Sequence, residues 1–135
     1  MKIFFVRHGK DDENFRGGWS SLGLVPEGIE QVKQLAVRLR KKKEEYDITK
    51  IVSSDLPRAV ETAEILEKEL ELPMMTDERL READNGDLAG MSNAEALVKY
   101  PGLFWNTLKP EECYPNGESP NMFFSRIKSW LEVFL

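Results

Sequence analysis

The residues of this chain best suited to chemistry are a histidine, three arginines and a glutamate in three short segments. His8, the only histidine, follows Arg7. Arg58 lies near the middle of the chain, and Arg81 directly precedes Glu82. A neutral imidazole nitrogen is a competent nucleophile at physiological pH, and guanidinium groups pair with phosphate oxygens in a bidentate manner. Two arginines beside a histidine predict a binding site for a dianionic group.

Predicted strands place these three segments at one edge of a sheet. Short apolar runs predict strands at residues 3–6, 48–52 and 74–76, and the first of these strands is expected to be buried. One of the three segments follows each run. Ligands of parallel α/β sheets bind beyond the carboxyl ends of the strands. We therefore expect His8, Glu82 and the arginines to meet at this edge.

Apolar stripes at helical spacing predict the helices that connect these strands. The stripes are Ile29, Val32, Ala36 and Leu39 after Pro26; Val60, Ala63, Leu66 and Leu70 after Pro57; and Phe123, Ile127, Trp130 and Phe134 near the end. Ser53-Ser54-Asp55 offers N-cap candidates for the helix at Pro57, and Ser92 with Glu95 forms a capping box for a short helix. The alternation of strands and helices predicts an α/β fold with a mostly parallel sheet.

The composition narrows the classes of protein to consider. A length of 135 residues predicts a single domain spanning 1–135. The net charge of -5 argues against a broad nucleic-acid-binding surface. The single cysteine, Cys113, excludes an internal disulfide and fits a reducing compartment. The apolar run before Arg7 is too short for a signal peptide or a membrane span. We therefore expect a cytoplasmic protein with no nucleic-acid or membrane partner.

Several motifs in a fixed order resemble those of one enzyme family. They are Arg7-His8-Gly9, Asn14, Leu24 to Gln31, Ser54 to Ala63, Leu80 to Gly90, and Pro115 to Ser119. The set is similar to the motifs of the histidine phosphatase superfamily, which is also called phosphoglycerate mutase-like. The resemblance covers nearly the whole chain. It implies a three-layer α/β/α fold with a mostly parallel sheet.

The resemblance also implies a role for each site residue. His8 would attack a phosphoryl group and become phosphohistidine, while Arg7 and Arg58 hold the oxygens on which negative charge collects. Glu82 would protonate the leaving oxygen and later help water to attack the phosphohistidine. Asn14 would be a secondary phosphate donor. The implied ligand is a small phosphorylated substrate or inorganic phosphate. No metal or organic cofactor is expected, because the arginines would neutralise the charge of the phosphate.

Two departures from the family pattern concern the catalytic set. Lys10-Asp11 stands where family members often have Glu followed by Thr or Ser, so a usual hydroxyl donor is missing. Family members also have a second histidine after a later parallel strand, and this chain has no second histidine. Its last residues continue an apolar helix pattern, which predicts a domain incomplete at its C-terminus. We therefore expect self-association through the incomplete sheet edge, or a shortened gene product.

Three functions remain open at this point. The first is metal-independent phosphomonoester hydrolysis through His8. The alternatives are phosphoryl transfer of the phosphoglycerate mutase type and a catalytically impaired, phosphate-binding fragment or pseudoenzyme. The short segment between Gly90 and Ser119 offers little cover for a phosphohistidine, which favours a phosphatase over a mutase. The candidates to line the specificity pocket are Lys10, Arg16, Trp19 and residues 100–114.

Overall fold

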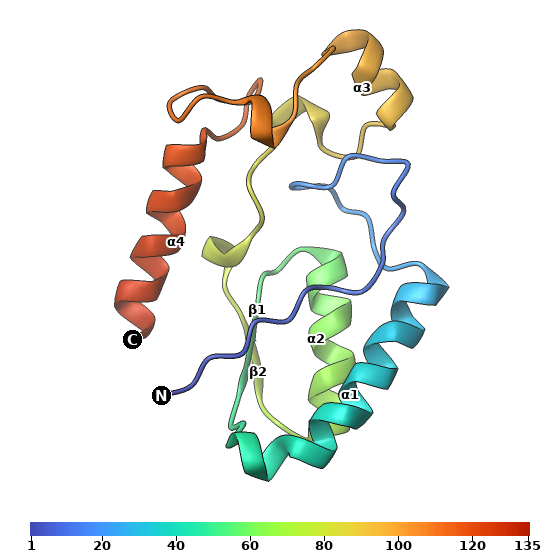
Figure 1. The fold of residues 1–135 in the computed structure, drawn as a ribbon, viewed down its shortest axis with the longest axis vertical. Helices are drawn as coiled ribbons and strands as arrows, with labels where there is room; N and C mark the ends of the chain where they lie inside the picture. The colour runs from blue at the N-terminus through green and yellow to red at the C-terminus, as the bar shows by residue number, and fades with distance from the viewer.

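The computed structural model describes residues 1–135. In Figure 1 the lower half of the molecule contains the strands and the two helices packed on them, and the upper half consists mostly of loops. The helices are α1 (Pro26–Tyr46), α2 (Pro57–Leu70), α3 (Asn93–Lys99) and α4 (Pro120–Phe134). The strands are β1 (Ile51–Ser53) and β2 (Met74–Thr76). Three 3-10 turns lie in the connections: η1 (Glu78–Leu80), η2 (Gly86–Leu88) and η3 (Trp105–Thr107).

The two strands form a parallel sheet. Ile51 lies opposite Met74, and Ser53 lies opposite Thr76. The connecting helix α2 packs on both strands, which makes the segment a β-α-β unit. The parallel pairing confirms the α/β class, and β2 covers the predicted residues. β1 begins at Ile51 rather than at the predicted Ile48.

The helices α1 and α2 pack against each other and enclose a small apolar core. Val32, Ala36, Leu66 and Leu70 form this core, and all four belong to the predicted stripes. Each helix has a proline in its first turn, where the missing N–H has no helical partner to lose. Each ends at a residue in the left-handed conformation, with φ of 55° in α1 and 52° in α2. The prolines and apolar stripes that predicted α1 and α2 are confirmed, whereas no side chain caps α2, so the N-cap prediction for Ser53-Ser54-Asp55 is wrong.

The prediction of a buried strand at residues 3–6 is wrong in this structure. The segment is extended, but residues 1–8 make no backbone hydrogen bond. Phe5 is 90% exposed and Phe4 is 48% exposed. A strand needs a neighbouring backbone edge as well as apolar side chains, and this segment does not pair with the free edge of β1. Its side chains instead border a cleft of about 510 Å³.

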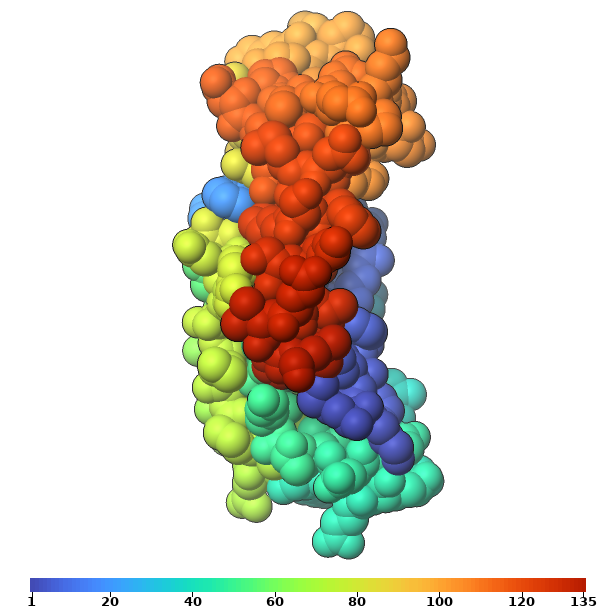
Figure 2. Space-filling view, turned by 90° about the vertical axis from the view of Figure 1, so that its left-hand side faces the viewer, coloured from blue at the N-terminus to red at the C-terminus, as the bar shows by residue number.

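Serine side chains cap the two later helices. The hydroxyl of Ser92 accepts a hydrogen bond from the N–H of Glu95 at the start of α3, as predicted. Ser119 caps α4 by accepting from the N–H of Met122. Figure 2 shows α4 running down one face of the molecule, and its contacts with η1 place it beside the segment that leads to Glu82. None of the helices is long and apolar enough to span a membrane.

Candidate active site

Arg58 lies in the first turn of α2 and is only 2% exposed. Its Nη2 donates to the carbonyl of Gly18 at 2.7 Å and to Oε2 of Glu82 at 2.8 Å. Its Nε is 3.8 Å from Oδ2 of Asp11. Its Nη1 is buried and has no hydrogen-bond partner within the chain. Because buried N–H groups are nearly always paired, the free Nη1 donors indicate the position of an acceptor from outside the chain.

The loop that presents the Gly18 carbonyl to Arg58 depends on glycine. Gly18 has a φ of +57°, which L side chains rarely adopt. A Cβ atom there would also lie 1.9 Å from Oδ1 of Asn85. That same oxygen accepts a hydrogen bond from the backbone N–H of Trp19 at 3.1 Å. The buried Asn85 therefore holds this loop against Arg58, a role that the sequence analysis missed.

His8 is half-buried at the end of the N-terminal segment. Its Nδ1 lies 2.7 Å from the carbonyl oxygen of Gly9. A proton on Nδ1 satisfies that contact and leaves the lone pair on Nε2 free for attack. The N–H of Gly9 donates to Oγ1 of Thr62 at 3.1 Å, and Thr62 donates to the carbonyl of Arg58 at 2.8 Å. These two hydrogen bonds connect the histidine segment to the first turn of α2.

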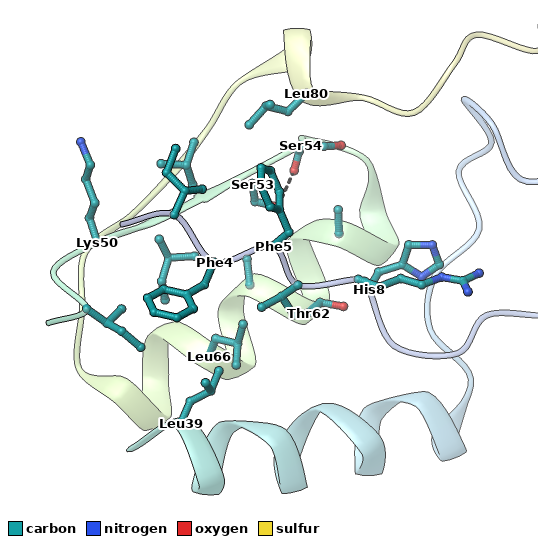
Figure 3. A pocket seen from close by; sticks show the side chains of 18 of the residues that line it. Phe4, Phe5, His8, Leu39, Lys50, Ser53, Ser54, Thr62, Leu66 and Leu80 are labelled. Atoms are coloured by element: carbon teal, nitrogen blue, oxygen red, sulfur yellow. Dashed lines mark hydrogen bonds between the residues drawn. The ribbon is translucent and has the colours of Figure 1, made fainter. Parts of the chain in front are cut away.

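One cleft brings together four of the five predicted site residues. Arg7, His8, Arg58 and Glu82 all line the 510 Å³ cleft, which extends between the N-terminal segment, β1, α2 and α4. Figure 3 shows His8 near Thr62 at one end, and apolar side chains such as Phe4 toward the other. Glu82 is open to solvent, with 59% of its side chain exposed. The arrangement combines a possible nucleophile, a buried guanidinium and an accessible carboxylate.

The structure does not bring Asn14 into this group. Its side chain is exposed and donates to Oδ1 of Asp12 at 2.9 Å. Asn14 lines neither of the two cavities that border Glu82. Its backbone instead fixes the start of α3, because its carbonyl accepts from the N–H of Asn93 at 2.8 Å. The Asn14 side chain would have to turn away from Asp12 to contact a ligand in the cleft.

The structure pairs Arg81 with Asp55, which is one of the N-cap candidates predicted for the helix at Pro57. Arg81 forms a bidentate ion pair with Asp55, so it is not free to bind phosphate. Asp55 therefore does not cap α2, whose N-cap residue is Leu56. The hydrogen bond from Arg81 is the main cause that holds the pKa of the Asp55 carboxyl below its ordinary value. The pair connects the end of β1 to the end of the β2 segment.

A brace from α4 holds the backbone around Glu82, and the sequence analysis did not foresee it. Arg126 Nη1 donates to the carbonyls of Arg79 and Arg81, each at 2.8 Å, and Nη2 donates to the carbonyl of Glu82 at 3.2 Å. The same guanidinium forms a bidentate pair with Glu118 at 2.8 and 2.7 Å. Glu118 belongs to the motif at Pro115 to Ser119, which could have pointed to it, but no sequence motif includes Arg126.

Three further hydrogen bonds hold the same loop. Oε2 of Glu118 accepts from the N–H of Asp84 at 2.9 Å, and the N–H of Glu118 donates to the carbonyl of Asp84 at 2.8 Å. The indole of Trp19 donates to the carbonyl of Glu82 at 2.7 Å. The polar groups of the Glu82 loop are therefore fixed from both sides, and its carboxylate is left facing Arg58.

Comparison with known proteins gives a consistent family. The sequence profile of the histidine phosphatase superfamily (branch 1) matches residues 3–134. A probable phosphoglycerate mutase of Proteus mirabilis is 37% identical over 143 residues, which cover 100% of this chain and 63% of that protein. Phosphoserine phosphatase 1 of Hydrogenobacter thermophilus is 31% identical over 137 residues, covering 98% of this chain and 63% of that protein.

Solved structures agree with these sequence matches. The mycobacterial glucosyl-3-phosphoglycerate phosphatase in complex with VO3 has a TM-score of 0.79 and 30% identity, covering 93% of this chain and 60% of that one. The same phosphatase with inorganic phosphate has a TM-score of 0.74 and 31% identity, covering 93% and 58%. The chain spans less than two thirds of the length of these relatives. On the profile match and these likenesses together, the chain belongs to the histidine phosphatase superfamily.

Proposed function

We propose that this domain hydrolyses phosphomonoesters through a phosphohistidine at His8, without a metal ion. Nε2 of His8 attacks phosphorus while the bond to the leaving oxygen breaks, and Glu82 gives that oxygen its proton. Water then attacks the phosphohistidine and gives a proton to Glu82, and inorganic phosphate is released. Arg58 and Arg7 hold the phosphoryl oxygens while charge collects on them.

The observation that carries this proposal is the unpartnered Nη1 of Arg58. Nη1 is buried, and Arg58 lines the cleft that His8 and Glu82 also line, so a phosphate oxygen that reaches Nη1 from this cleft would satisfy its donors. One relative, solved with VO3 and again with inorganic phosphate, supports a phosphate site in the family. We propose Asn14 as a secondary donor that reaches the phosphate after leaving Asp12.

The test is the hydrolysis of an aryl phosphate by the wild-type protein, by His8→Ala and by Gln34→Ala. Gln34 is an exposed residue of α1, which makes it a control for handling and folding. We expect Gln34→Ala to match the wild type and His8→Ala to lose turnover. An acid-labile phosphate trapped on wild type but absent from His8→Ala would identify the intermediate. Equal rates for wild type and His8→Ala would exclude the role of His8.

Two alternatives make different predictions in the same assays. In phosphoryl transfer of the mutase type, a phosphoglycerate is converted to an isomer with little release of free phosphate. The relative of Proteus mirabilis that is named a mutase keeps this alternative in view. A catalytically impaired, phosphate-binding domain would be stabilised against heat by phosphate or vanadate without any turnover. The absence of a second histidine from the sequence favours that outcome for this chain.

We further propose a cytoplasmic location and self-association. The single cysteine, Cys113, is exposed and unpaired, which suits a reducing compartment. Exposed apolar side chains of the N-terminal segment support association between copies of the chain.

A further inference from the structure

A second carboxylate, to which the proposed reaction gives no role, lies beside Arg58. Oδ2 of Asp11 is 3.8 Å from Arg58 Nε, and only 21% of the Asp11 side chain is exposed. Glu82 contacts Nη2 of the same guanidinium at 2.8 Å. The neighbouring Lys10 does not neutralise Asp11, because its Nζ pairs with Glu27 at 2.8 Å. Two carboxylates therefore share one buried cation, and a dianion that binds to this cation has to approach both of them.

The distance indicates that Asp11 attracts Arg58 without holding it in place. At 3.8 Å, Oδ2 and Nε are too far apart for a hydrogen bond. The guanidinium is held instead by the Gly18 carbonyl at 2.7 Å and by Glu82 at 2.8 Å. Removing the charge of Asp11 would therefore change the electrostatics around Arg58 and leave both of these hydrogen bonds intact.

The backbone that carries Asp11 is fixed against the start of α1. The N–H of Lys10 donates to Oε1 of Gln31 at 3.0 Å, and the Lys10 carbonyl accepts from the N–H of Val25 at 3.0 Å. Lys10 also packs so closely on Gly28 that a Cβ atom there would lie 2.1 Å from the Lys10 carbonyl oxygen. The backbone before Asp11 therefore has little freedom to move away when an anion binds.

We propose that Asp11 sets the affinity of the phosphate site by weakening it. Its carboxylate competes with the phosphoryl group for the positive charge of Arg58, and it also repels that group directly. This inference rests on the proposed function, because it requires a phosphate at Arg58. Its consequence for turnover is that inorganic phosphate, the product, leaves the site more readily than it would if residue 11 were neutral.

Calorimetry with inorganic phosphate measures this effect without depending on turnover. Asp11→Asn and Asp11→Thr both remove the charge, and Asp11→Glu keeps it. The control is Glu13→Gln, which removes the same charge from an exposed side chain of the same loop. We expect the two neutral variants to bind phosphate about 10-fold more tightly than wild type at low salt. Asp11→Glu should show no gain, and Glu13→Gln should stay within about twofold of wild type.

The salt dependence of binding provides a second readout. Counterions screen the repulsion between Asp11 and phosphate, so the gain in Asp11→Asn should shrink when the ionic strength rises from about 0.05 M to about 0.5 M. A merely structural role for Asp11 would not produce this pattern, because a variant with a damaged site binds phosphate more weakly at both ionic strengths. A gain of the same size at both ionic strengths would contradict the electrostatic effect.

The remaining outcomes separate this inference from the proposed function. If wild type binds phosphate and both neutral variants bind it equally well or more weakly, the phosphate site stands and the inference is wrong. If Asp11→Glu gains as much affinity as Asp11→Asn, the charge is not the cause and the inference is again wrong. Binding by the neutral variants alone would support both proposals. If wild type and the neutral variants all fail to bind, the phosphate site itself is refuted, and the inference is refuted with it.

Discussion

The segment that carries Glu82 and the segment that carries His8 border the same cleft but are held in very different ways. Residues 79–84 receive hydrogen bonds from Arg126, from the Trp19 indole and from the Glu118 backbone. Residues 1–8 make no backbone hydrogen bond at all. Their main attachments are the stacking of Phe4 on Tyr46 and the Gly9 hydrogen bond to Thr62 that follows them.

This difference shows which half of the site is organised in advance. The Glu82 carboxylate and Arg58 are fixed relative to each other by a contact of 2.8 Å and by the brace from α4. The position of His8 depends on a segment with few buried contacts, and such segments open at low free energy. Substitutions on the acid side should therefore change both stability and phosphate binding, whereas those near the N-terminus should leave stability nearly unchanged.

The largest expected effect is that of Arg58→Met on phosphate binding. The substitution removes the unpartnered Nη1 donors and leaves the Gly18 carbonyl and Glu82 without their shared donor. We expect phosphate affinity and any turnover to fall about 100- to 1,000-fold. Calorimetry with inorganic phosphate measures the loss. Arg40→Met, which breaks an exposed pair with Glu69, is the control and should bind phosphate normally.

A conservative variant sharpens the role of Arg58. Lysine keeps the charge, but one ammonium group cannot reproduce the planar set of donors to Gly18, Glu82 and a phosphate. We expect Arg58→Lys to recover only a small part of the affinity. Phosphate affinity in Arg58→Met equal to that of wild type would show that the free Nη1 does not mark an anion site.

The second effect is a loss of stability in Arg126→Met. The side chains of Arg126 and Glu118 are only 17% and 11% exposed, so the substitution leaves Glu118 buried without its partner. It also leaves the carbonyls of Arg79 and Arg81 without a side-chain donor, whereas the carbonyl of Glu82 keeps the hydrogen bond from the Trp19 indole. We expect the free energy of unfolding to fall by about 3 kcal/mol, as measured by urea denaturation.

A matched control for this variant lies in the same helix. Lys128→Met breaks an exposed pair with Glu132 and should lower the free energy of unfolding by less than about 1 kcal/mol. Similar losses in the two variants would mean that the brace contributes no more than a surface ion pair. Amide hydrogen exchange should also speed up in residues 79–85 of Arg126→Met and stay unchanged in residues 2–8.

The third effect concerns pH. Burial alone would raise the pKa of the Glu118 carboxyl, but hydrogen bonds from Arg126 and from the Asp84 N–H hold it below its ordinary value of 4.5. Because the pKa is lower in the folded state, the carboxylate stabilises the fold above about pH 4.5. That contribution is lost as the pH falls through the folded-state pKa. Asp55, with a pKa lowered mainly by its hydrogen bond from Arg81, acts in the same direction.

The measurement compares urea midpoints at pH 3.5 and pH 6. We expect wild type to lose stability at the lower pH. Glu118→Gln should lose less, because it lacks the Glu118 carboxylate, but it should still lose some stability through Asp55. Glu132→Gln, at an exposed position of α4, should behave as wild type. A Glu118→Gln protein with the full wild-type pH dependence would contradict the role of this carboxylate.

The sequence was sufficient to predict helices and strands wherever local signals and burial agree. The prolines at the starts of α1 and α2, the apolar stripes of α1, α2 and α4, and the serine cap of α3 all predicted elements that the structure contains. The order of these elements also placed His8, Arg58 and Glu82 on one cleft. Periodicity and capping are properties of neighbouring residues, so they can be interpreted without knowing the tertiary structure.

The errors all depend on long-range partners. An apolar run at 3–6 cannot show whether a backbone edge will pair with it, and here none does. Asp is a residue type that often caps helices, but Asp55 instead pairs with Arg81, which lies 26 residues away in the chain. Arg126 resembles an ordinary polar residue of an amphipathic helix until its contacts with the Glu82 loop are known. Side-chain partners far apart in the chain leave no mark in sequence spacing.

The smallest expected effect on stability is that of Phe5→Ser, which tests the weakly held side of the comparison. Phe5 is 90% exposed, so the change should alter the free energy of unfolding by no more than about 0.5 kcal/mol. Phe124→Ser, at a position of α4 that is 67% exposed, is the matched control. Both variants and wild type are compared by urea denaturation and by their mass in solution over a range of concentrations.

Self-association through the N-terminal face separates the two variants. If copies of the chain bury this face together, wild type and Phe124→Ser form dimers or larger species, and Phe5→Ser shifts toward the monomer at the same concentration. A wild-type monomer with a cooperative melt would contradict self-association but keep the comparison, provided that Phe5→Ser is neutral. A large loss of stability in monomeric Phe5→Ser would contradict the comparison itself, because the N-terminal segment would then be packed as firmly as the Glu82 loop.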